Sequence, residues 1–209
     1  MASRGKFYVL EGIDGSGKST QAKLLSEYLK QQGRKVVLTC EPTYEPIGKT
    51  IRDCLTHKMD AHPITIATLF AADRHEHIVH PTYGIMQYLD AGYDVVSDRY
   101  LLSSYAYQSL ECNMDWVMQI NKINENLLLP DVNFYIDLTA KEAMERIQAN
   151  RVEIDLYETE DILQKVYDNY QNSFDKIPES FRSKIIKING NQSLETIHQH
   201  IIQKCEEEI

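Results

Sequence analysis

A glycine-rich phosphate-loop motif near the N-terminus constrains the fold more than any other feature of this sequence. Residues 12–19 read GIDGSGKS and fit the pattern GxxxxGK(S/T). An apolar run at 7–10, closed by Glu11, precedes the motif, and a helical pattern of apolar residues begins at Lys18. This order of strand, glycine loop and helix is typical of the first half of a right-handed βαβ unit. The chain is therefore expected to fold around a parallel sheet.

The remaining sequence repeats the alternation of strand and helix. Apolar runs suited to buried parallel strands occupy residues 7–10, 35–39, 93–97, 132–137 and 184–188, with stretches of helical period between them. No linker rich in serine, glycine or proline divides the 209 residues, which predicts a single domain over 1–209. The predicted fold class is α/β, a three-layer, doubly wound parallel sheet of about five strands with helices on both faces. The least regular stretch, 149–156, is interpreted as a mobile flap.

Composition and charge exclude several classes of function. The chain has 22 Lys and Arg against 31 Asp and Glu, a net charge of −9, so non-specific nucleic-acid binding is not expected. No window reaches the roughly 20 apolar residues that span a bilayer, and no signal-peptide core follows the N-terminus. The four cysteines are far apart, which indicates free thiols. A cytoplasmic protein without a membrane or nucleic-acid partner is predicted.

The phosphate loop predicts the contacts of a nucleoside triphosphate. Its backbone N–H groups and the positive end of the following helix suit a phosphate anion, and Lys18 suits the charge on the β and γ phosphates. The Ser19 hydroxyl is a candidate ligand of Mg²⁺, and Asp98, at the end of an apolar strand, is the candidate second acidic element. The predicted nucleotide-binding residues of the loop are Gly12, Ile13, Asp14, Gly15, Ser16, Gly17, Lys18, Ser19 and Thr20.

Other residues choose among the classes of phosphate-loop protein. A guanine-reading NKxD motif is missing, since the nearest match, 121–124, ends in an amide, which disfavours a switch GTPase. A nucleic-acid motor needs a basic track, which the charge balance does not supply. A kinase of small molecules remains the favoured class.

Several motifs in their order and spacing resemble the thymidylate kinases, which transfer the γ-phosphate of ATP to dTMP. The matching segments are 11–21 (EGIDGSGKSTQ), Glu41 with Pro42, 69–74 (LFAADR), 98–100 (DRY), Ser103 with Ser104, 106–108 (AYQ), Pro130 with Asp131, 135–138 (YIDL), Arg146, Arg151, and Tyr157 with Glu158. They extend over nearly the whole chain. The resemblance implies a phosphate-loop NTPase fold with a short lid at about 149–157, ATP and Mg²⁺ as cofactors, production of dTDP for dTTP synthesis, and a homodimer.

The resemblance also implies a binding site for dTMP. Asp14 resembles the acid that holds the deoxyribose 3′-hydroxyl, and Arg99 resembles the arginine that binds the dTMP phosphate. Phe70 resembles the ring stacked on thymine and Arg74 the donor to a base oxygen, one helical turn apart on one face. Tyr107 resembles the residue under the sugar, where its bulk excludes a ribose 2′-hydroxyl. Gln108, Glu41, Pro42, Ser103 and Tyr157 are implied as further substrate contacts.

Charge neutralisation during transfer is expected from the lid. The loop carries Gly15 where some relatives carry arginine, so the resemblance implies that Arg151, with Arg146 as a second contact to ATP, supplies the positive charge. The residues implied as catalytic are Asp14, Lys18, Arg99 and Arg151. Each residue also has an ordinary structural explanation, as a cap, a core side chain or a surface ion pair.

Two departures from the family pattern lie next to Glu41. Cys40 stands where many relatives have arginine, and Thr43 and Tyr44 replace a glycine pair. The phosphate contacts there are expected to differ, with Lys49 or Arg52 as possible replacements. The alternatives to a dTMP kinase are a kinase of another deoxynucleoside or nucleoside monophosphate, and a nucleotide-binding regulator without transfer activity.

Overall fold

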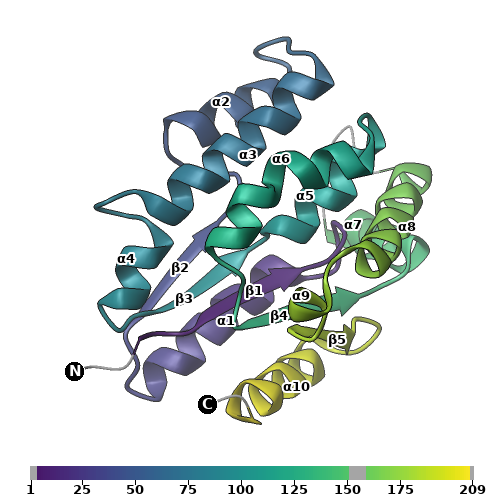
Figure 1. Ribbon diagram of the computed structural model, residues 1–209. Helices are drawn as coiled ribbons and strands as arrows, with labels where there is room; N and C mark the ends of the chain where they lie inside the picture. Colours follow the sequence, from purple (N-terminus) through teal and green to yellow (C-terminus); the bar gives the residue numbers. More distant parts are fainter. Residues whose placement is uncertain (1–3, 151–158, 208–209) are drawn as a thin grey trace.

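A five-stranded parallel sheet forms the centre of the protein in the computed structural model, which describes residues 4–150 and 159–207 (Figure 1). The strands are β1 (Phe7–Glu11), β2 (Val36–Cys40), β3 (Asp94–Asp98), β4 (Val132–Asp137) and β5 (Ile185–Asn189). They lie in the order β2-β3-β1-β4-β5 and all pair in parallel. Strands β2 and β3 lie on one side of β1, and β4 and β5 lie on the other. The phosphate loop therefore follows the strand at which the strand order reverses, and α/β sheets bind ligands at such a point.

Helices cover both faces of the sheet and bury alternate strand residues. Tyr8 and Leu10 of β1 pack in one core with α1 (Lys18–Gln31) and α10 (Leu194–Glu207), while Phe7 and Val9 pack in a second core on the other face. That second face carries α3 (Pro63–Val79), α4 (Ile85–Asp90), α5 (Leu101–Tyr107), α6 (Met114–Leu127), α7 (Ala140–Asn150), α8 (Glu160–Lys176) and α9 (Glu179–Arg182). The short elements α2 (Pro46–Leu55) and η1 (Gln108–Leu110) flank α3 and α5. The three-layer α/β prediction is confirmed.

The strand predictions are correct to within one residue at each end. The 132–137 run coincides with β4, whereas β2, β3 and β5 each begin and end one residue later than predicted. The predicted burial is wrong for β2 and β5, whose residues are mostly half-buried because both strands lie at the edges of the sheet. Leu38 of β2 is 40% exposed.

The predicted irregular stretch begins later than expected. Helix α7 continues to Asn150, so the first two residues of the stretch are helical, as suits the high helix propensity of alanine at Ala149. Residues 151–157 lie outside the described part of the chain, and with them the predicted roles of Arg151 and Tyr157. Among the described helices, none is long and apolar enough to cross a membrane.

Candidate functional site

Glycines curl the loop between β1 and α1 into an anion-binding shape. Gly15 and Gly17 have φ angles of 81° and 92°, in the left-handed region that favours glycine. A Cβ atom on Gly15 would lie 2.7 Å from the carbonyl oxygen of Ala143, so a side chain there would clash with α7. The Ser16 N–H donates to the carbonyl of Ile13 at 3.2 Å. Such a turn at the start of a helix presents backbone N–H groups to an anion.

Asp14 lies at the centre of a charged cluster that joins this loop to the connection between β3 and α5. Its Oδ1 lies 3.0 Å from Nζ of Lys18 and 2.5 Å from Nη2 of Arg99. The Tyr107 hydroxyl donates to Oδ2 at 2.9 Å and accepts from the Asp14 N–H at 3.0 Å. Burial alone would raise the pKa of Asp14, but the charges of Arg99 and Lys18 outweigh it and hold the pKa well below its usual range. Asp14 is therefore ionised at neutral pH.

Replacing Asp14 with asparagine is expected to remove a pH-dependent part of the stability. A carboxylate whose pKa is lowered by folding stabilises the native state above its unfolded pKa of about 3.9, and this contribution is lost as the pH falls towards the folded pKa. The difference in unfolding free energy between wild type and Asp14→Asn should therefore be largest near neutral pH and shrink below about pH 4. Urea unfolding across this range measures it, and a constant difference would contradict the ion cluster.

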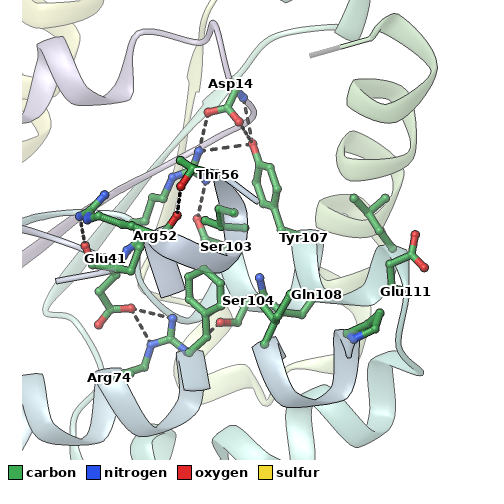
Figure 2. Close-up of a pocket in the computed structure, with 17 residues that line it drawn as sticks. Asp14, Glu41, Arg52, Thr56, Arg74, Ser103, Ser104, Tyr107, Gln108 and Glu111 are labelled. Carbon is green, nitrogen blue, oxygen red and sulfur yellow. Dashed lines mark hydrogen bonds and ion pairs between the residues drawn. The ribbon is translucent and has the colours of Figure 1, made fainter. Parts of the chain in front are cut away.

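A pocket of about 460 Å³ opens beside Asp14 (Figure 2). The predicted substrate residues that line it are Asp14, Glu41, Pro42, Phe70, Arg74, Arg99, Ser103, Tyr107 and Gln108. They come from the phosphate loop, the segment after β2, helix α3, and the segment from the end of β3 to η1. The structure thus brings together every predicted substrate contact except Tyr157, which lies outside the described residues.

Arg99 reaches the pocket from a strained backbone position. It has a φ angle of 76°, which a non-glycine residue rarely adopts. Its N–H donates to the carbonyl of Leu10 at 2.9 Å, and the Ser97 hydroxyl donates to its carbonyl at 2.8 Å. The Arg99 guanidinium lies 4.6 Å from the centre of the Tyr107 ring. Burial and the adjoining Asp14 raise the pKa of Tyr107, so its hydroxyl keeps the proton that it donates.

Arg74 is a buried residue of the pocket wall, and its guanidinium already contacts several protein groups. Its Nε donates to Glu41 Oε2 at 2.8 Å, and Nη2 lies 2.6 Å from the same oxygen. The other donated hydrogen bonds go to Ser104 Oγ (2.9 Å), Asn121 Oδ1 (2.5 Å) and the Tyr100 carbonyl (2.9 Å). Four of the five N–H groups of Arg74 thus donate hydrogen bonds, and its Nη2 is also in ion-pair contact with Glu41. The contact to a base oxygen that the resemblance implies would compete with these protein partners.

The residues predicted to bind Mg²⁺ lie at the carboxyl edge of the sheet. Asp98 ends β3 and is the register partner of Leu10 in β1, next to the start of the phosphate loop. Its Oδ1 is buried and has no hydrogen-bond partner among the described residues. Ser19 is exposed in the first turn of α1, as is Thr20. A hydroxyl and an unpartnered carboxylate oxygen are the hard ligands that suit Mg²⁺.

Arg146 lies on α7, the helix that approaches the phosphate loop at Gly15. Its Nη2 donates to the carbonyl of Gly190 at 2.6 Å and to that of Gln192 at 3.2 Å. It therefore contacts the turn between β5 and α10 and does not line the pocket of Figure 2.

Sequence reasoning missed part of the pocket wall and left Arg52 unresolved. Arg52 lines the pocket and donates to the Pro42 carbonyl, whereas Lys49 is exposed on the same helix and is not part of the wall. The Arg52 guanidinium lies 4.4 Å from the centre of the Tyr44 ring, and the Arg52 Nε is buried without a partner among the described residues. The residues not predicted are Leu55, Thr56, Pro63, Ile66, Ser104, Leu110 and Glu111. Helical spacing from Arg52 and Phe70 marks those on α2 and α3.

Comparison with known proteins gives one consistent result. A family model described as thymidylate kinase matches residues 10–201. A probable thymidylate kinase of Thermococcus kodakarensis is 40% identical, with 96% of this chain and 97% of that protein covered. A probable thymidylate kinase of Methanococcus aeolicus is 38% identical, with 95% of each chain covered. A thymidylate kinase of Caldanaerobacter subterraneus subsp. tengcongensis is 35% identical, with 98% and 96% covered.

Proposed function

The chain belongs to the thymidylate kinase family, and from this premise we propose that it transfers the γ-phosphate of ATP to dTMP, giving dTDP and ADP. One observation carries the proposal: Asp14 belongs to the phosphate loop and also lines the pocket that holds Phe70 and Arg99. A loop suited to a triphosphate and a pocket suited to a nucleoside monophosphate thus have Asp14 in common. Phosphoryl transfer needs this proximity of donor and acceptor.

The proposed acceptor site places dTMP along the pocket. The phosphate lies at Arg99, whose planar fork suits it, and the deoxyribose lies at Asp14 and Tyr107. Thymine stacks on Phe70, near Gln108, at the end of the pocket that Arg74 and Glu41 close. Because Arg74 already donates four hydrogen bonds within the protein, its main effect in this proposal is to hold the pocket wall.

The proposed donor site uses the phosphate loop. Lys18 exchanges its contact with Asp14 for the β and γ phosphates of ATP, and the backbone of 12–19 surrounds the β-phosphate. Ser19 and Asp98 would hold Mg²⁺, which when bound neutralises phosphate charge. Arg151, from a lid at about 149–157, and Arg146, on α7, add positive charge over the transferring group. Support for this arrangement is the position of α7, which packs against the loop at Gly15.

Arg52 is proposed as a second phosphate contact. Its Nε, which is buried and has no partner among the described residues, and its place in the pocket wall support this role, and it stands near Cys40, where many relatives carry arginine.

A homodimer and a cytoplasmic location are also part of the proposal. Exposed Ile64 on α3 and Ile123 on α6 are available for subunit contact, and the four cysteines are free thiols.

The proposed function predicts a clear acceptor preference. Purified protein with ATP and Mg²⁺ should form ADP at least about tenfold faster with dTMP than with dUMP, dCMP or thymidine, because only dTMP presents both a thymine ring and a phosphate.

In the Phe70→Ala variant, the KM for dTMP should rise by about tenfold while the KM for ATP changes little, since stacking contributes about 1–2 kcal/mol. A coupled assay of ADP release measures both effects.

Two outcomes would contradict the proposal. Equal rates with all four acceptors would show that the pocket does not select dTMP and would favour a kinase of other nucleotides. ATP binding without acceptor-dependent ADP release would favour the regulator.

A further inference from the structure

A buried carboxylate that the proposed mechanism does not use lies directly before the phosphate loop. Glu11, the last residue of β1, has no exposed surface. Its Oε1 accepts the backbone N–H groups of Tyr100 (2.9 Å) and Ser103 (3.1 Å), at the start of α5. Its Oε2 accepts the hydroxyls of Ser103 (2.5 Å) and Tyr170 (3.0 Å). All four donors are uncharged, which makes an ionised carboxylate here costly to bury.

These hydrogen bonds set the direction of the Ser103 hydroxyl. A serine hydroxyl has one proton and two lone pairs, and Glu11, in the ionised state that the charge of Arg99 favours, can only accept. The proton of Ser103 therefore points at Glu11, which leaves its oxygen free to accept Nη1 of Arg99 at 3.2 Å. Arg99 is thereby held between Asp14 on one side and Ser103 on the other.

Tyr170 extends the same network to helix α8. Its hydroxyl lies 3.0 Å from Oε2 of Glu11, 3.0 Å from Oγ of Ser103 and 3.3 Å from the carbonyl oxygen of Gly12. One hydroxyl of α8 thus touches the end of β1, the phosphate loop and the start of α5. Burial raises the pKa of Tyr170 well above its usual value, so this hydroxyl keeps its proton.

We propose that Glu11 and Tyr170 are positioning residues that hold Ser103 and, through it, Arg99 in the geometry that receives the acceptor phosphate. Glu11 also provides a hydrogen-bond acceptor at the N-terminus of α5, for the N–H groups of the N-cap residue Tyr100 and of Ser103 in the first turn. Two hydrogen bonds hold the strained backbone of Arg99 in place. The Arg99 N–H donates to the carbonyl of Leu10, and the N–H of the next residue, Tyr100, donates to Glu11. The proposal deepens the proposed function and rests on it.

Glu11→Gln is the sharpest test, because it keeps the size and shape of the side chain and replaces one acceptor oxygen with an NH₂ donor. The amide oxygen takes the place of Oε1, where two N–H groups need an acceptor, so the amide NH₂ faces Ser103. The Ser103 proton then loses its acceptor, and Nη1 of Arg99 competes with the new donor. Burial raises the pKa of Glu11, whereas the hydrogen bond from Ser103 and the charge of Arg99 act in the opposite direction. The neutral amide of glutamine avoids the cost of burying a charge at this position.

The experiment measures dTMP binding by titration calorimetry without ATP, and ATP binding separately, in wild type, Glu11→Gln and Tyr170→Phe. Glu11→Gln is expected to raise the Kd of dTMP about tenfold and Tyr170→Phe about threefold, with the Kd of ATP within about twofold of wild type. The matched control is Tyr105→Phe, a buried tyrosine of α5 whose hydroxyl donates to Glu125 at 3.2 Å, away from this network. Thermal melting checks that each variant is folded.

The outcomes separate this inference from the proposed function. If Glu11→Gln binds dTMP like wild type, or if it weakens ATP and dTMP by the same factor, the positioning role is refuted. If Glu11→Gln does not fold, Tyr170→Phe decides by the same criteria. Wild-type protein that binds no dTMP would refute the proposed function and this inference with it, whereas unchanged binding in both variants refutes this inference alone.

Discussion

Replacing Lys18 with alanine is expected to lower kcat by about 10³-fold or more, the largest effect on activity that we predict. In the proposed reaction Lys18 provides the positive charge of the phosphate loop at the β and γ phosphates, and it is buried beside the loop. The fold should survive the change, because Asp14 keeps its contacts with Arg99 and Tyr107. Single-turnover kinetics with dTMP and ATP measures the chemical step.

The control for this prediction is Lys23→Ala, which removes an exposed lysine from the same helix and should leave kcat within about twofold of wild type. A Lys18→Ala protein that is folded and retains about a tenth of the wild-type kcat would contradict the assigned role.

Replacing Arg74 with methionine is expected to cause the largest loss of stability. The Arg74 and Glu41 side chains are 1% and 3% exposed. The substitution therefore removes the guanidinium that faces the buried Glu41 carboxylate, which keeps its contact with the His77 ring at 3.1 Å. Removing one partner of a buried ion pair destabilises a protein by about 3–5 kcal/mol, and in a chain of this size that corresponds to about 10 °C in Tm. Reversible urea unfolding and thermal melting provide the two measurements.

Two controls test whether the lost charge is the cause. The double variant Arg74→Met with Glu41→Leu should recover part of the loss, because no unpaired charge is then buried. Arg4→Met breaks an exposed ion pair with Asp131 and should cost less than about 1 kcal/mol. A double variant less stable than Arg74→Met would show that packing matters more than the charge.

Local sequence rules predicted the features that depend on near neighbours in the chain. The phosphate loop, its flanking strand and helix, and the five strands follow from glycine spacing and apolar periodicity, which act over fewer than about twenty residues. Phe70 and Arg74 were placed on one helical face for the same reason. The strand ends were off by one residue because a polar residue such as Asp98 can still pair in a sheet.

Features that depend on tertiary contacts were not predictable in this way. Arg74 draws its partners from Glu41, Tyr100 and Asn121, which lie 33, 26 and 47 residues away. Periodicity carries no information on which polar groups meet when helices pack. Glu11 gave one indirect signal: a charged residue directly after a buried apolar strand needs partners, yet nothing in the sequence names Tyr170.

The ion cluster around Asp14 has a consequence for how anions compete at this edge of the sheet. Lys18 and Arg99 are both paired with a carboxylate, because Asp14 Oδ1 lies next to each of them. An incoming anion must therefore compete with the Asp14 carboxylate for these two cations. A phosphate with two charges and several acceptor oxygens can do so, whereas chloride, with a single diffuse charge, gains too little. If Lys18 and Arg99 bind phosphates as proposed, the Asp14 carboxylate should therefore disfavour the binding of chloride at the same two cations.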